Sequence, residues 1–168
     1  FLCRQRDGTR FVKILDFGIA KLGVSQAQSA QASMLVGTPS YMAPEQAAGG
    51  KVGPALDIYA VGVMSFEMLT GRLPFTGDSV MEVLMGHANK PPPDLQSLNP
   101  AVPDALNSLV QFMLAKRPDQ RPMSAQLVAD EIETIRYQLL ETQFRSAPTI
   151  KRLGFSRDID AVVTARRN

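Results

Sequence analysis

The chain has a single cysteine, Cys3, among its 168 residues. One cysteine excludes an internal disulfide and fits the reducing environment of the cytoplasm, which is where we expect the protein to be. Cys3 lies in a short apolar stretch, and this context predicts a small buried side chain rather than a reactive thiol.

The sequence also has no large excess of one charge sign and no long apolar run. Eighteen Lys and Arg residues face sixteen Asp and Glu residues, a net charge of +2 that predicts no nucleic-acid partner. The longest apolar stretch, residues 60–69, is too short to span a bilayer and contains Glu67. The N-terminus has no secretory signal. We therefore expect no membrane span within this chain, and an anchor elsewhere in a parent protein stays open.

What is present suits one soluble globular domain. Hydrophobic residues make up 45% of the chain and charged residues 20%, and 168 residues are enough to bury a core. Residues 1–4 and 11–15 are β-prone and flank a turn, so they predict a hairpin. Residues 19–42 are rich in Ser, Ala and Gln and predict a long loop, which is usually functional in a compact domain.

The remainder of the chain predicts helices. A short helical turn opens at Pro44, and a helix follows over residues 54–70, where Gly71 stops it. Apolar side chains lie on every face of this second helix, so we expect it to be buried all round. Further helices are predicted over 79–88 and 103–114, with an extended stretch at the prolines 91–93 and a long final helix capped by Ser124.

The helical spacing of apolar residues fades from about Glu141. Residues 141–168 carry six Lys or Arg and three acids. This composition favours a solvated basic tail or linker, and a segment that binds anionic lipid is the alternative. We therefore divide the chain into a domain at 1–140 and a tail at 141–168.

Two motifs carry the functional interpretation. The tripeptide Asp-Phe-Gly at 16–18 ends an apolar strand and places a carboxylate where a divalent cation could be held. The segment Gly-Thr-Pro-Ser-Tyr-Met-Ala-Pro-Glu follows at 37–45. In this order and spacing the two motifs resemble the magnesium-binding and activation segments of eukaryotic-type serine/threonine protein kinases, and most of all the bacterial members. The resemblance covers about residues 1–138 and implies a mainly α-helical C-terminal lobe with a short β-hairpin.

The other catalytic motifs of that family are not in this sequence. A glycine-rich loop, a strand lysine and a catalytic loop carrying the base precede Asp-Phe-Gly in the family, whereas only fifteen residues precede Asp16 here. We expect the chain to be a C-terminal fragment that begins just downstream of the catalytic loop. As given, it is predicted to be inactive alone.

The resemblance implies ATP and Mg²⁺ as cofactors. Asp16 would hold the magnesium that neutralises the phosphates of ATP, and Leu15 would lie against the nucleotide. Phe17 would pack beneath the site, and Gly18 would allow the segment to swing. The alternative for Asp16 is an acid that only caps a turn.

Protein substrates with Ser or Thr hydroxyls are the implied partners. In serine/threonine kinases the threonine at the place of Thr38 shapes the pocket for a hydroxyl substrate, and Gly37, Pro39, Ser40 and Tyr41 complete the implied substrate-binding segment. A plain turn threonine is the alternative for Thr38.

Three charged residues are implied to be structural. In the family the acid of Ala-Pro-Glu, here Glu45, forms a buried ion pair with an arginine at the place of Arg121. Asp57 opens the helix over 54–70, where an acid suits the helix dipole, and by resemblance it anchors the backbone of the catalytic loop.

Ser25, Ser29 and Ser33 are candidate autophosphorylation sites, since they lie between the two motifs; self-association would serve that reaction, and ordinary solvated serines are the alternative. The lone histidine, His87, predicts a surface or packing role rather than catalysis.

Two other functions stay open. A pseudokinase, a kinase-like interaction module without turnover, would keep the same fold, and the catalytic loop would distinguish it. A helical binding domain unrelated to kinases would match these motifs only by accident.

Overall fold

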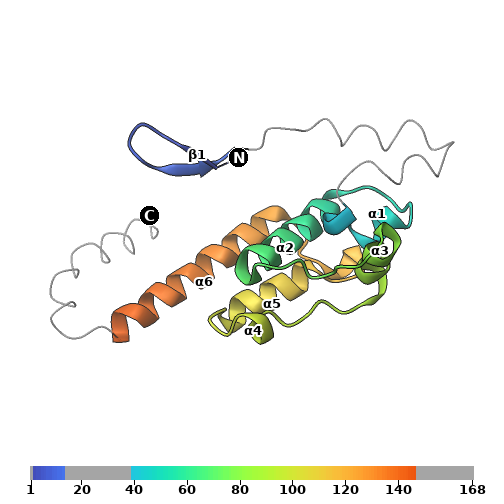
Figure 1. Cartoon of the computed structure of the whole chain (residues 1–168). Helices are drawn as coiled ribbons and strands as arrows, with labels where there is room; N and C mark the ends of the chain where they lie inside the picture. The colour runs from blue at the N-terminus through green and yellow to red at the C-terminus, as the bar shows by residue number, and fades with distance from the viewer. Residues whose placement is uncertain (1, 14–38, 147–168) are drawn as a thin grey trace.

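The computed structural model describes residues 2–13 and 39–146 (Figure 1). Strands β1 (Leu2–Arg4) and β2 (Arg10–Val12) pair antiparallel, with Leu2 opposite Val12. This confirms the predicted hairpin over its described part. Gly8 in the turn has a φ of 88°, a conformation that glycine adopts at little cost. Cys3 is half-buried rather than fully buried.

All other described elements are helical, as expected. They are, in chain order, η3 (Pro39–Tyr41), α1 (Pro44–Ala47), α2 (Pro54–Thr70), α3 (Val80–Asn89), α4 (Leu95–Leu98), α5 (Asp104–Met113), η4 (Pro118–Gln120) and α6 (Ala125–Ser146). The predicted fold, mainly α-helical with a short hairpin, is therefore confirmed.

The helix ends follow from identifiable residues. Pro54 stands in the first turn of α2, where its missing N–H costs nothing, and Gly71 ends the helix with a φ of 70°. The Ser79 hydroxyl caps α3 by accepting from the Glu82 amide, and the Ser124 hydroxyl accepts from the Leu127 amide at the start of α6. The short helix α4 was not predicted, although Asp94 caps it through the Ser97 amide at 2.9 Å.

The prediction that α2 is buried all round is wrong. One face is buried, through Ile58, Tyr59, Gly62, Val63 and Phe66. The opposite face carries Val61, Met64 and Met68, whose exposed fractions are 42%, 50% and 78%. Among the described residues, α5, α4, η3 and η4 pack on α2, and the side chains of this second face stay exposed. An apolar composition on every side does not reveal which sides are covered.

The core lies around α5, which packs on both α2 and α6. The buried hydrophobic residues that form it include Val63, Phe66, Leu95, Val110, Met113, Leu114, Val128 and Ile135. Helices α2 and α5 approach closely at Gly62. A Cβ atom there would stand 2.9 Å from the Cβ of Met113, nearer than real Cβ contacts come.

Helix α6 continues to Ser146, past the predicted boundary at residue 140. The residues after Ser146 lie outside the described ranges, so the division into domain and tail stays a prediction. Within residues 2–13 and 39–146, no helix combines the length and the apolar character that crossing a bilayer requires.

Candidate functional site

The predicted site residues divide into two groups. Leu15, Asp16, Phe17, Gly18, Ser25, Ser29, Ser33, Gly37 and Thr38 all lie outside the described residues. Their predicted roles in metal, nucleotide and hydroxyl binding, and the phosphorylation of the serines, therefore stay predictions. The second group is described: η3 carries Pro39, Ser40 and Tyr41, α1 carries Glu45, and Asp57 lies exposed in the first turn of α2.

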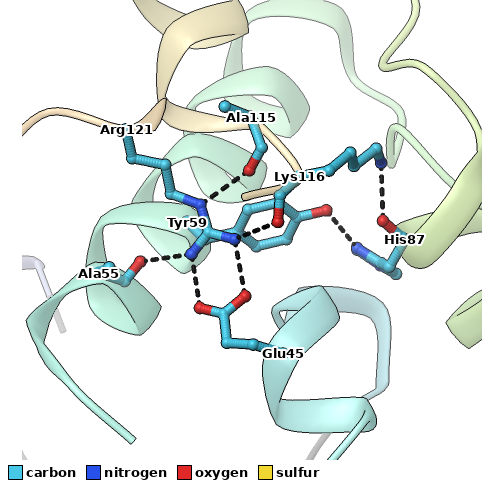
Figure 2. Close-up of polar contacts among 7 residues, drawn as sticks. All are labelled: Glu45, Ala55, Tyr59, His87, Ala115, Lys116 and Arg121. Atoms are coloured by element: carbon cyan, nitrogen blue, oxygen red, sulfur yellow. Dashed lines mark hydrogen bonds and ion pairs between the residues drawn. The ribbon is translucent and has the colours of Figure 1, made fainter. Parts of the chain in front are cut away.

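The structure brings Glu45 and Arg121 together although 76 positions separate them (Figure 2). The two guanidinium nitrogens Nη1 and Nη2 each donate to one carboxylate oxygen of Glu45 at 2.7 Å. The side chain of Arg121 is fully buried, and that of Glu45 is 14% exposed. The expected ion pair is thus present in its bidentate form, the strongest geometry for such a pair.

Arg121 uses every N–H that it has. Besides the two bonds to Glu45, Nε donates to the Ala115 carbonyl at 2.8 Å, Nη1 to the Ala55 carbonyl at 2.9 Å and Nη2 to the Lys116 carbonyl at 3.1 Å. Five donors meet five acceptors, so the buried cation has no unsatisfied N–H. This one side chain therefore ties α1, the first turn of α2 and the segment after α5 to one another (Figure 2).

Local sequence explains how the two partners are presented. Pro44 starts α1, which sets Glu45 in its first turn, and the Gly50 amide closes the following loop by donating to the Glu45 carbonyl at 2.7 Å. At the other end, Pro118 opens η4, and Arg121 follows it in an extended conformation with φ −100° and ψ 167°. The arginine side chain thereby enters the core from the segment between α5 and α6.

Tyr59, on the buried face of α2, connects the ion pair to α3. Its ring lies under the guanidinium of Arg121, with 4.7 Å from the guanidinium carbon to the ring centroid. Its hydroxyl is 2.9 Å from Nδ1 of His87, which is fully buried (Figure 2). Burial is the main reason that the pKa of the Tyr59 hydroxyl is raised above its ordinary value. The hydroxyl therefore keeps its proton.

His87 is held from two further sides. The ring of Phe75 meets the imidazole edge-on at 4.8 Å between centroids. Nζ of Lys116 donates to the His87 backbone carbonyl at 2.7 Å and lies 4.1 Å from the centroid of Phe75. Burial, and then the nearby charge of Lys116, lowers the pKa of His87 to about 4. The packing role expected for His87 is confirmed, whereas its link to Tyr59 was missed. No signal in the sequence singles out this pair, because α2 and α3 carry other polar side chains as well.

A separate hydrogen bond fixes η3. The Tyr41 hydroxyl donates to Oε2 of Glu67 on α2 at 2.6 Å, and this bond is the main reason that the pKa of Tyr41 is raised. The ion pair, the contact between Tyr59 and His87, and the bond from Tyr41 to Glu67 form one arrangement around α2. What it can do is hold the segment 39–47 rigidly against α2 and α3.

We expect the buried imidazole to make the fold sensitive to acid. The pKa of His87 lies at about 4 in the folded chain against an ordinary 6.5, so the unfolded chain binds more protons between these values. The stability that results is present above pH 6.5 and is lost as the pH falls towards 4. Urea unfolding should therefore show that lowering the pH from 7 to 4.5 costs the wild type about 2 kcal/mol more than His87→Phe. Equal losses in the two proteins would contradict the burial of a neutral imidazole.

Comparisons with known proteins agree with this geometry. Residues 1–132 match the model of the family described as protein kinase domain. The serine/threonine-protein kinase Pkn1 of Myxococcus xanthus is 46% identical over 121 residues, which are 72% of this chain and 18% of that protein. The DNA damage-responsive serine/threonine-protein kinase RqkA of Deinococcus radiodurans is 41% identical over 139 residues, 83% of this chain and 21% of that protein.

A third relative, the serine/threonine-protein kinase PknA of Mycobacterium tuberculosis, is 42% identical over 125 residues, which are 74% of this chain and 28% of that protein. The chain thus spans between about a fifth and just over a quarter of these relatives. The similarity includes the helical region in which Glu45 and Arg121 meet.

Proposed function

This chain belongs to the protein kinase domain family, and we propose that it forms the C-terminal lobe of a bacterial serine/threonine protein kinase. The proposed reaction is the transfer of the γ-phosphoryl group of ATP to a serine or threonine hydroxyl of a protein. The observation that carries the proposal is the buried bidentate pair of Glu45 and Arg121, which braces the segment that immediately follows Pro39, Ser40 and Tyr41.

In such a reaction, the ion pair of Glu45 and Arg121 would keep the neighbouring substrate-binding segment in place. Phosphoryl transfer depends on positioning and on electrostatic stabilisation rather than on covalent chemistry by the protein. A segment that receives a protein substrate must therefore hold its place while the substrate binds and leaves. The proposed substrate-binding residues 37–41 lie directly before α1, and Tyr41 and Glu45 are each tied to the body of the lobe.

The cofactors follow from the family. Protein kinases generally use ATP and Mg²⁺, and the metal supplies positive charge to the phosphates. In this chain Asp16 is the proposed ligand of the metal, with Leu15, Phe17 and Gly18 around the nucleotide. Thr38 is proposed to shape the pocket for the accepting hydroxyl.

The test is phosphate transfer by the full-length protein that contains this chain. With labelled ATP, Mg²⁺ and a general protein substrate, we expect label on serine and threonine after acid hydrolysis of the product. Residues 1–168 alone provide the control, and they should transfer nothing, because the glycine-rich loop, the strand lysine and the base are not in this sequence. A full-length protein without turnover would instead support the pseudokinase, and label on tyrosine alone would contradict the substrate class.

Autophosphorylation is expected in the loop between the two motifs. Ser25, Ser29 and Ser33 are the proposed acceptors, because a phosphate of roughly −1.5 to −2 charges there could order the loop against an arginine. Mass spectrometry of the active full-length protein should find at least one of them modified, and the Asp16→Ala variant should carry none. A loop that stays unmodified in active protein would remove this regulation, and with it the reason for self-association.

A further inference from the structure

Nε2 of His87 is the one buried side-chain nitrogen or oxygen without a hydrogen-bond partner in residues 2–13 and 39–146. Buried polar groups in folded proteins are nearly always paired, because an unpaired one loses its hydration without compensation. The neighbouring buried cation, Arg121, has all of its donors paired. The orphan nitrogen therefore stands out in an otherwise satisfied interior.

The hydrogen bond to Tyr59 indicates where the imidazole proton sits. The imidazole is neutral and carries a single N–H, and the Tyr59 hydroxyl keeps its proton because burial raises its pKa. If Nδ1 held the proton and donated to Tyr59, the buried hydroxyl proton would have no acceptor. If instead the hydroxyl donates to Nδ1, the hydroxyl proton and the lone pair of Nδ1 are both paired. The imidazole proton then lies on Nε2. The orphan is thus an N–H donor.

The Ser40 backbone lies near the imidazole, on an element that packs against α3. It raises the pKa of His87, as a carbonyl near a ring N–H does, although no hydrogen bond of ordinary geometry joins the two residues. Helix α3, which carries His87, packs directly on η3, which carries Ser40. Phe75 and the bond from Lys116 to the His87 carbonyl hold the histidine in place. Lys116 is also the charged group that acts on the ring from the segment after α5.

We propose that His87 is a positioning residue for the protein substrate, with its Nε2–H holding the Ser40 carbonyl so that residues 39–41 keep the conformation that a substrate binds. The hydrogen bond between the Tyr59 hydroxyl and Nδ1 orients the imidazole ring for this contact. An unpaired buried donor favours this contact, because pairing offsets the cost of its burial. This inference rests on the proposed function, because it assigns residues 37–41 to the substrate.

The experiment compares KM values in the full-length protein. His87→Leu should raise the KM for a peptide or protein substrate about tenfold, while the KM for ATP and kcat stay within about twofold. His87→Gln should keep the peptide KM within about threefold of the wild type, because its amide can place a donor near the position of Nε2. Tyr59→Phe, which keeps the ring under Arg121, should raise the peptide KM about threefold, since the ring is then free to hold its proton on either nitrogen.

Met81→Leu is the matched control. Met81 lies on α3 as His87 does, but its side chain is 57% exposed, so this variant should behave as the wild type. A rise of both KM values together in His87→Leu would indicate general damage and overturn the proposal. If His87→Leu does not fold, Tyr59→Phe decides. A raised peptide KM in Tyr59→Phe, with His87→Gln near the wild type, supports the proposal, and an unchanged peptide KM in Tyr59→Phe contradicts it.

Amide hydrogen exchange gives a readout that does not require activity. Exchange in residues 39–47 should be at least several-fold faster in His87→Leu and Tyr59→Phe than in Met81→Leu. Unchanged exchange would overturn the role of His87 even in an active kinase. Absence of phosphate transfer from the wild type, with faster exchange in the variants, would instead overturn the proposed function and leave the contact to Ser40 standing.

Discussion

Replacing Arg121 by alanine is expected to lower the free energy of unfolding by about 3–5 kcal/mol, the usual loss when one partner of a buried ion pair is removed. The variant leaves the carboxylate of Glu45 without its cation, and it leaves the carbonyls of Ala55, Ala115 and Lys116 without the donors that they have now. Chemical denaturation followed by circular dichroism measures the difference directly.

Arg117 offers a matched control a few residues away. It also forms an ion pair at 2.7 Å, with Asp119, but the side chains are 70% and 63% exposed. Exposed pairs contribute at most about 1 kcal/mol, so Arg117→Ala should be nearly neutral. Arg121→Lys should recover little stability, because an ammonium group cannot make the two parallel bonds to Glu45. Similar losses in Arg121→Ala and Arg117→Ala would show that burial of the pair does not matter.

Replacing Asp16 by alanine in the full-length protein is expected to reduce phosphate transfer by a factor of about a hundred to a thousand or more, which is the scale of losing one preorganised electrostatic group in an active site. The proposed reason is that the carboxylate holds the Mg²⁺ that neutralises the phosphates of ATP. Steady-state kinetics with saturating ATP and Mg²⁺ measures the effect, and the thermal midpoint should stay within a few degrees of the wild type.

Asp7→Ala is the control for Asp16. Asp7 lies in the hairpin turn, where Oδ1 accepts from the Thr9 amide at 2.9 Å, and the proposed reaction has no use for it. We expect normal transfer from this variant. Magnesium-dependent turnover that persists in Asp16→Ala would remove Asp16 from its proposed role, whatever the stability of the protein.

The positions of the α-helices other than α4 could be predicted because their ends depend on local chemistry. Pro44, Pro54 and Gly71 act through backbone angles and missing N–H groups, which neighbouring residues do not override, and the serine caps act over three residues. Burial could not be predicted in the same way. Whether Met64 or Met68 is covered depends on which other element packs there, and that information is not contained in α2 itself.

In the candidate site, too, one contact could be predicted from the sequence and another could not. The pairing of Glu45 with Arg121 was expected only through the resemblance of two motifs to a family, since 76 positions separate the residues. The contact between Tyr59 and His87 spans 28 positions and belongs to no motif. It follows from the way α3 packs beside α2, so it emerges from tertiary structure and could not be read from a window of sequence.

The close approach at Gly62 determines which substitutions this part of the fold tolerates. Every other amino acid adds at least a carbon where Met113 and Leu114 already stand 2.9 and 3.2 Å from the place that it would occupy. A mutation at this codon therefore cannot be absorbed by a small rearrangement of a flexible side-chain end, because the nearest obstacle is a Cβ. The exposed Met64 and Met68 leave room for other side chains, whereas any residue other than glycine at position 62 would force α2 and α5 apart.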